Sequence, residues 1–156
     1  MNAILRTVAA GAAAGAAGTT VLNAITYLDM AVRARPASST PEESARRLAR
    51  AVGMHIPGDE EQQQNRAAGI GPLLGLAAGV GTGVLAAGAR ALGWRPGRAV
   101  GIAATTGVVL LAANAPMTVL KVTDPRTWSA ADWASDILPH LGYAIAADAV
   151  LRALEP

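Results

Sequence analysis

A glycine stands at every fourth position of Gly71-Pro-Leu-Leu-Gly75-Leu-Ala-Ala-Gly79-Val-Gly-Thr-Gly83, and Ala87 continues the row. On an α-helix this spacing places the four glycines on one face. Such a helix would be weak in water, where each interior glycine costs roughly 1 kcal/mol relative to alanine. In a lipid bilayer the same smooth face lets a second helix approach closely. This glycine-zipper pattern therefore predicts a membrane-embedded helix with a tightly packed neighbour.

The composition also favours a membrane protein. Charged residues make up 15% of the chain, whereas soluble domains have about 25%. Alanine and glycine account for 37 and 17 of the 156 residues, and a soluble core built from them would bury little apolar area. Cysteine is absent, which excludes disulfides, thiol catalysis and thiolate metal sites. The net charge of +2 is too small to indicate nucleic-acid binding.

Four apolar segments are long enough to cross a hydrocarbon core of about 30 Å. We expect helices at about 3–31, 66–92, 99–121 and 130–154. The predicted fold class is all-α, a four-helix transmembrane bundle that forms a single integral membrane domain over residues 1–156. A secretory signal peptide is the alternative interpretation of the first segment, with Arg6 as its charged region.

The one long polar segment covers residues 32–65. Thr40-Pro41-Glu42-Glu43 predicts the start of a helix, with Thr40 as N-cap and Glu43 completing a capping box. Apolar and arginine side chains then fall on opposite faces, which predicts a short amphipathic helix over about 41–53. This helix lies either at the headgroup level of the membrane or in a solvated loop.

Topology places the polar residues of three spans at one end of the bundle. The first and third spans end, and the fourth begins, on the same side of the membrane, here called side X. Polar groups within spans normally turn inward and pair, because a central acid costs about 2.5–3.5 kcal/mol on insertion scales. We therefore predict a polar pocket in one leaflet, lined by Asn23, Thr26, Asp29, Asn114, Thr118, Lys121, Asp132, Asp136 and His140.

His140 lies one helical turn from Asp136 within the fourth span. One interpretation is a proton-titrating pair, because a carboxylate favours the charged imidazole and histidine changes charge near neutral pH. The other is a structural hydrogen bond that locks the fourth helix against the first and third. The sequence leaves both interpretations open.

Ion pairs and close helix contacts complete the expected packing. The spacing of Asp148 and Arg152 predicts an interfacial ion pair, and Asp29 is expected to pair with Lys121 or Arg126. Small residues at fourfold spacing are expected to form the helix contacts, namely Gly71, Gly75, Gly79, Gly83, Gly11 and Gly15.

Other motifs give no site that we would assign. Gly81-Thr-Gly83-Val-Leu-Ala86 matches a dinucleotide-binding pattern, but it lies inside an apolar helix instead of following a strand. The two histidines, His55 and His140, are far apart in the sequence, so we expect no metal ion. We also expect no cofactor and no catalytic residue. A membrane enzyme that uses Asp136 and His140 as acid and base is the least favoured interpretation.

The last quarter of the chain carries a recognisable pattern. Ser135-Asp136-Ile137 is followed by His140-Leu141, by Tyr143, and then by Asp148 and Arg152. This pattern resembles the YagU-like family of small bacterial inner-membrane proteins. The resemblance implies a multi-pass protein of the inner (plasma) membrane with a cytoplasmic C-terminus, so that side X faces outward. It also implies an association with acid resistance.

Two functions of different classes follow from these observations. The first is a small multi-pass membrane protein with a proton-sensitive polar pocket, which aids acid tolerance or small-solute passage. The second is a structural or accessory membrane subunit whose glycine row docks a partner. The expected partners are the lipid bilayer and either a second copy of the chain or another membrane protein, and not nucleic acid.

Overall fold

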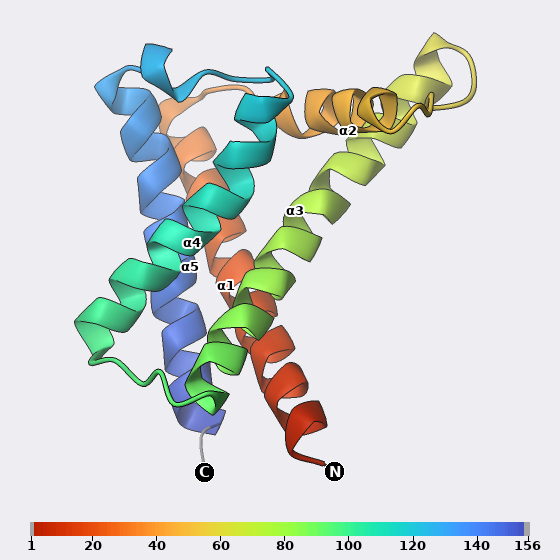
Figure 1. The fold of residues 1–156 in the computed structure, drawn as a ribbon. Coiled ribbons are helices and arrows are strands. Elements are labelled where there is room, and N and C mark those ends of the chain that lie inside the picture. Colours follow the sequence, from red (N-terminus) through yellow and green to blue (C-terminus); the bar gives the residue numbers. More distant parts are fainter. Residues whose placement is uncertain (1, 155–156) are drawn as a thin grey trace.

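The computed structural model of the chain describes residues 2–154, which are helical apart from their short connections and contain no strand. Four of the helices are long and apolar enough to cross a membrane, and a shorter helix lies across one end of their bundle (Figure 1). The all-α prediction is therefore confirmed. The elements in order are α1 (Ala3–Arg33), α2 (Thr40–Ala51), α3 (Glu60–Ala91), α4 (Arg98–Val119), the 3-10 turn η1 (Pro125–Thr127) and α5 (Ala130–Leu154).

The helix α3 begins at Glu60, about a turn and a half before the predicted start. Asp59 caps it, because its carboxylate accepts a hydrogen bond of 2.8 Å from the backbone N–H of Gln62. Two glutamates in the first turn suit the positive end of the helix dipole. With 32 residues, α3 is about 48 Å long. It therefore extends beyond a hydrocarbon core of about 30 Å, and its first turns project past the bundle.

The helix α2 packs on this projecting part of α3 and lies across the bundle at side X (Figure 1). Ala45 of α2 is buried, and a methyl group added to Gly71 of α3 would lie 2.6 Å from the carbonyl carbon of Pro41. The predicted capping box is wrong. The N-cap is Ser39, without a side-chain hydrogen bond, and Glu43 pairs with Arg47 at 2.5 Å instead of returning to the helix start.

Backbone-to-backbone contact joins α1 to α3. A methyl group added to Gly15 would lie 2.6 Å from the carbonyl oxygen of Gly79, and one added to Gly83 would lie 2.5 Å from the nitrogen of Gly15. Gly11 meets Gly83 in the same way, at 2.8 Å from its carbonyl oxygen. Gly75 differs, because it is exposed and a methyl group there would meet nothing within 4 Å. The row therefore contacts α1 over only part of its length.

The side chain of Tyr143 joins α5 to the crossing of α1 and α3. It is fully buried, and its hydroxyl donates a hydrogen bond of 2.6 Å to the carbonyl oxygen of Gly79. Its ring occupies the space beside Gly18, where a methyl group would lie 2.5 Å from a ring carbon. Around it lies a core of mostly small residues, Ala14, Ala87, Val109, Ala144, Ala147 and Leu151.

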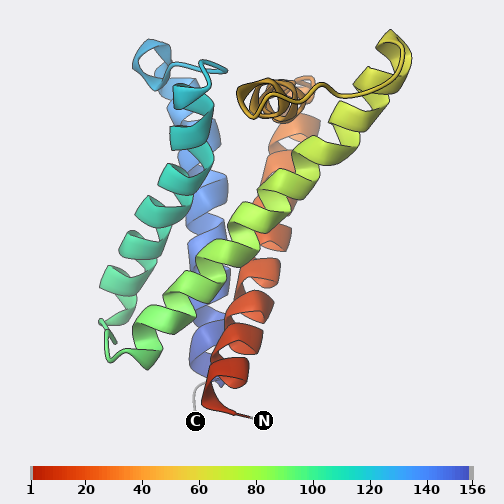
Figure 2. The same cartoon turned by 45° about the vertical axis from the view of Figure 1, so that its right-hand side comes forward.

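This arrangement brings the polar ends of three helices to side X. The C-terminal ends of α1 and α4 and the N-terminal end of α5 lie at the same end of the bundle, and residues close to both chain ends lie at the other (Figure 1). Figure 2 shows α3 and α4 close together near the chain ends and diverging toward side X. The α5 helix packs against α1 and α4, so its polar residues can meet those of both neighbours.

Gly83→Ala tests the crossing of α1 and α3. We expect it to lower the free energy of unfolding by about 1–3 kcal/mol, because the added methyl group forces two backbones apart. The matched control is Gly75→Ala, which we expect to leave stability unchanged or slightly raised, since alanine favours the helix. Thermal unfolding in detergent, followed by circular dichroism, measures both. Equal losses in the two variants would contradict the crossing.

Candidate functional site

Asn114, Asp136 and His140 form a hydrogen-bonded group between α4 and α5, here called the Asp136 cluster. The side-chain amide of Asn114 donates to Oδ2 of Asp136 at 2.7 Å. Nδ1 of His140 lies 2.6 Å from the backbone carbonyl oxygen of Asp136 and 3.4 Å from its Oδ1. The side chains of His140 and Asp136 are 11% and 18% exposed, so a charge here is largely removed from water.

The cluster forms because α4 and α5 are consecutive antiparallel neighbours. A short connection joins them at side X, and Asn114 near the end of α4 therefore meets Asp136 near the start of α5. Thr118 lies one turn from Asn114 and donates to its carbonyl oxygen at 2.8 Å. From α1, Arg33 donates to the hydroxyl of Ser135 at 2.8 Å. Arg33 thus ties α1 to α5 at the residue before Asp136.

The hydrogen bonds assign a tautomer to His140. A backbone carbonyl oxygen only accepts, so Nδ1 carries the hydrogen in the neutral ring, and Nε2 is the atom that takes up a proton. Oδ1 of Asn114 is buried and has no hydrogen-bond partner among residues 2–154. Buried acceptors are normally satisfied. The cluster therefore combines a carboxyl–imidazole pair with an acceptor that is open to a donor.

Asp29 does not have the partner that we expected. It pairs with Nε of Arg35 at 2.5 Å and with Arg33 at 3.4 Å, instead of with Lys121 or Arg126. The physical reason is the turn after α1. Ala34 adopts a left-handed conformation with φ of 51°, and the next residue, Arg35, reaches back to the last turn of α1.

The other residues of the predicted pocket have separate surroundings. Asp132 accepts hydrogen bonds from the backbone N–H and the hydroxyl of Ser129 at 2.9 and 2.7 Å, which stabilises the start of α5. Thr26 donates to the carbonyl oxygen of Leu22 in its own helix at 2.9 Å. Asn23 and Lys121 are exposed. Of the nine predicted residues, the structure therefore brings together Asn114, Asp136 and His140, and Thr118 bonds only within its own helix.

A second charged group lies at the opposite end of the bundle. Asp148 is 4% exposed and pairs with Nε of Arg152 at 2.8 Å, as predicted. Two further arginines contact its carboxylate, Arg98 at 3.7 Å and the buried Arg90 at 3.8 Å. Sequence reasoning missed both of these arginines.

The order and direction of the helices could have predicted the contacts of these two arginines with Asp148. The helices α3 and α5 end, and α4 begins, at the end away from side X, and there Arg90 and Arg98 lie within 3.8 Å of the carboxylate of Asp148. Asp148 is the only acidic residue of the described chain at this end. An acid within a span requires partners, and the arginines at the adjoining helix ends are the ones available.

Comparison with known proteins identifies no relative of this chain. No protein-family model matches this chain, and neither a curated protein nor a solved structure matches it. The resemblance to the YagU-like family therefore stays a prediction. The geometry of the Asp136 cluster and of the group around Asp148 is therefore the basis for a functional proposal.

Asp148→Asn tests the second group. We expect a loss of about 3 kcal/mol in the free energy of unfolding, because the substitution removes the charge of a buried carboxylate that three arginines contact. Asp124→Asn removes an acid that pairs with the exposed Arg126 in the loop, and we expect a change of less than about 1 kcal/mol. Thermal unfolding in detergent compares them. Similar losses would show that the burial of Asp148 is unimportant.

Proposed function

We propose that the chain is a small multi-pass protein of a bacterial inner membrane in which the Asp136 cluster responds to protons. This response would serve acid tolerance or the passage of a small solute. The observation that supports the proposal is the largely buried pair of Asp136 and His140 beside Oδ1 of Asn114, which has no donor among the described residues. Polar residues of this kind within a span commonly mark a pathway or a proton relay.

The chemistry follows from the hydrogen bonds. With a neutral imidazole, the charge of Asp136 is balanced by the dipole of the Asn114 amide and not by a cation. A proton that arrives at Nε2 of His140 converts the pair into an imidazolium and a carboxylate 3.4 Å apart. The net charge of the pair then changes from −1 to zero. Such a change can loosen or tighten the contact between α4 and α5.

The two arginines at the end of α1 are already paired. Arg33 of α1 donates to Ser135 and contacts Asp29, which Arg35 also holds. The helix α4 carries its one charged residue, Arg98, at the opposite end. Arginine does not lose its proton in the physiological range. His140 is therefore the residue of the cluster to which the proposal assigns the uptake of a proton.

The alternative function is an accessory subunit that docks a partner through the glycine row. Gly79 and Gly83 contact α1 of the same chain, and Gly71 contacts Pro41. Gly75 is the member of the row that faces open space. Docking through the row would therefore centre on Gly75. Gly75→Leu would then change the oligomeric state, as measured by light scattering in detergent, without unfolding the monomer.

Tryptophan fluorescence tests the response to protons. Trp133 lies three residues before Asp136 on α5, and it reports on the cluster when the other two tryptophans are replaced by phenylalanine. We expect its emission to change between about pH 5 and 8 in the parent chain and to stay constant across this range in His140→Gln. The matched control is His55→Gln, which removes the other, exposed histidine and is expected to keep the transition.

Two outcomes would contradict the proposal. One is the absence of a transition in the parent chain, combined with a lower thermal stability of His140→Gln, which would identify the contact as a structural lock. The other is the same transition in His140→Gln as in the parent. Vesicles that contain the protein and a pH-sensitive dye test passage separately, and we expect Asp136→Asn to abolish any flux that depends on pH.

A further inference from the structure

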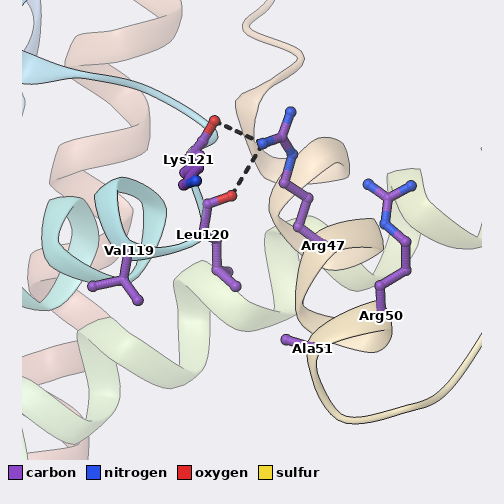
Figure 3. A pocket seen from close by; sticks show the side chains of 6 residues that line it. All are labelled: Arg47, Arg50, Ala51, Val119, Leu120 and Lys121. Carbon is purple, nitrogen blue, oxygen red and sulfur yellow. Dashed lines mark hydrogen bonds between the residues drawn. The ribbon is translucent and has the colours of Figure 1, made fainter.

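An open hollow of about 460 Å³ lies at side X, between α2 and the end of α4. Figure 3 shows the six residues that line it, Arg47, Arg50, Ala51, Val119, Leu120 and Lys121. The helix α4 has 22 residues and is therefore about 33 Å long, close to the thickness of the hydrocarbon core. Its end places the hollow at the level where a membrane span meets the lipid headgroups.

Arg47 fixes the two walls of the hollow against each other. Its Nη1 donates to the backbone carbonyl oxygens of Leu120 and Lys121 at 3.1 and 2.7 Å (Figure 3). Its Nε pairs with Glu43 at 2.5 Å. The hydrogen bond from Arg47 holds the pKa of the Glu43 carboxyl below its usual range. Glu43 therefore stays charged in mild acid, and Arg47 remains in place.

Arg50 and Lys121 are the cations of the hollow that are available to a ligand. The side chain of Arg50 is 58% exposed, and its one ion pair within the described residues is a long contact of 3.5 Å to Glu43. Lys121 is exposed and forms no ion pair with any residue in the range 2–154. Arg47, Arg50 and Lys121 carry three positive charges and the adjacent Glu43 carries one negative charge. The hollow therefore has a net positive charge.

The apolar wall distinguishes this hollow from a site for a free anion. Val119 is 80% exposed and lies with Leu120 at the end of the apolar helix α4. A ligand that used both walls would carry a negative charge at one end and hydrocarbon at the other. Basic pockets beside transmembrane helices are typical binding sites for anionic lipid headgroups.

We propose that this hollow binds an anionic phospholipid. The phosphate is held by Arg50 and Lys121, since guanidinium and ammonium groups are the usual phosphate ligands. The upper part of the acyl chains lies against Val119 and Leu120. The bound lipid would tie α2 to the membrane surface and to α4. This inference does not depend on the proton response of the Asp136 cluster.

Native mass spectrometry of the full chain in detergent tests the proposal by titration with phosphatidylglycerol or phosphatidylcholine. We expect tighter binding of phosphatidylglycerol. Each basic residue near a membrane surface is worth about fivefold in affinity, so Arg50→Gln combined with Lys121→Gln should weaken phosphatidylglycerol binding about 25-fold and leave phosphatidylcholine binding unchanged. Arg47 is kept, because its loss would separate α2 from α4.

The matched control combines Arg66→Gln with Arg126→Gln. It removes the same charge from side X outside the hollow, and we expect it to keep the preference. Arg50→Lys with Lys121→Arg should also keep it, and circular dichroism confirms that each variant is folded. The proposal is overturned if the parent shows no preference, if the control loses as much affinity as the test variant, or if soluble glycerol phosphate competes as strongly as the lipid.

Discussion

The close approach of two helix backbones at Gly15 and Gly79 is the contact on which the rest of the bundle depends. Lipid chains are as apolar as the helix surfaces, so hydrophobic burial does not drive the helices together, and close packing must do so. Glycine allows this packing because it has no side chain to separate the backbones. The helix α1 therefore becomes the centre of the bundle, with α3 on one side and α5 on the other.

Tyr143 fixes the position of α5 relative to the crossing of α1 and α3. Its ring fits beside Gly18 of α1, and its hydroxyl bonds to the carbonyl oxygen of Gly79 in α3. One side chain thus sets both the depth and the rotation of α5. His140 lies three residues before it and Asp148 five residues after it, so the same contact positions the polar groups at both ends of the bundle.

Features that depend on helix length and periodicity could be predicted from the sequence. The four spans follow from the length of their apolar segments, and the pairing of Asp136 with His140 follows from their spacing of one turn. Other features depend on angles between elements. The contact of Gly75 was wrongly expected, because crossing helices diverge away from their point of contact. The partner of Asp29 depends on the left-handed turn at Ala34, which no spacing rule indicates.

Asp148 and Asp136, both on α5, differ in the groups that compensate their charge. Asp148 has three arginines within 3.8 Å, and these cations keep their charge at every physiological pH. The negative charge of Asp148 is therefore compensated at every physiological pH, as a structural ion pair requires. Asp136 has an amide and one imidazole, so its balance depends on whether His140 holds a second proton. A group that exchanges protons needs this incomplete compensation, and the proposal places the response at Asp136 for that reason.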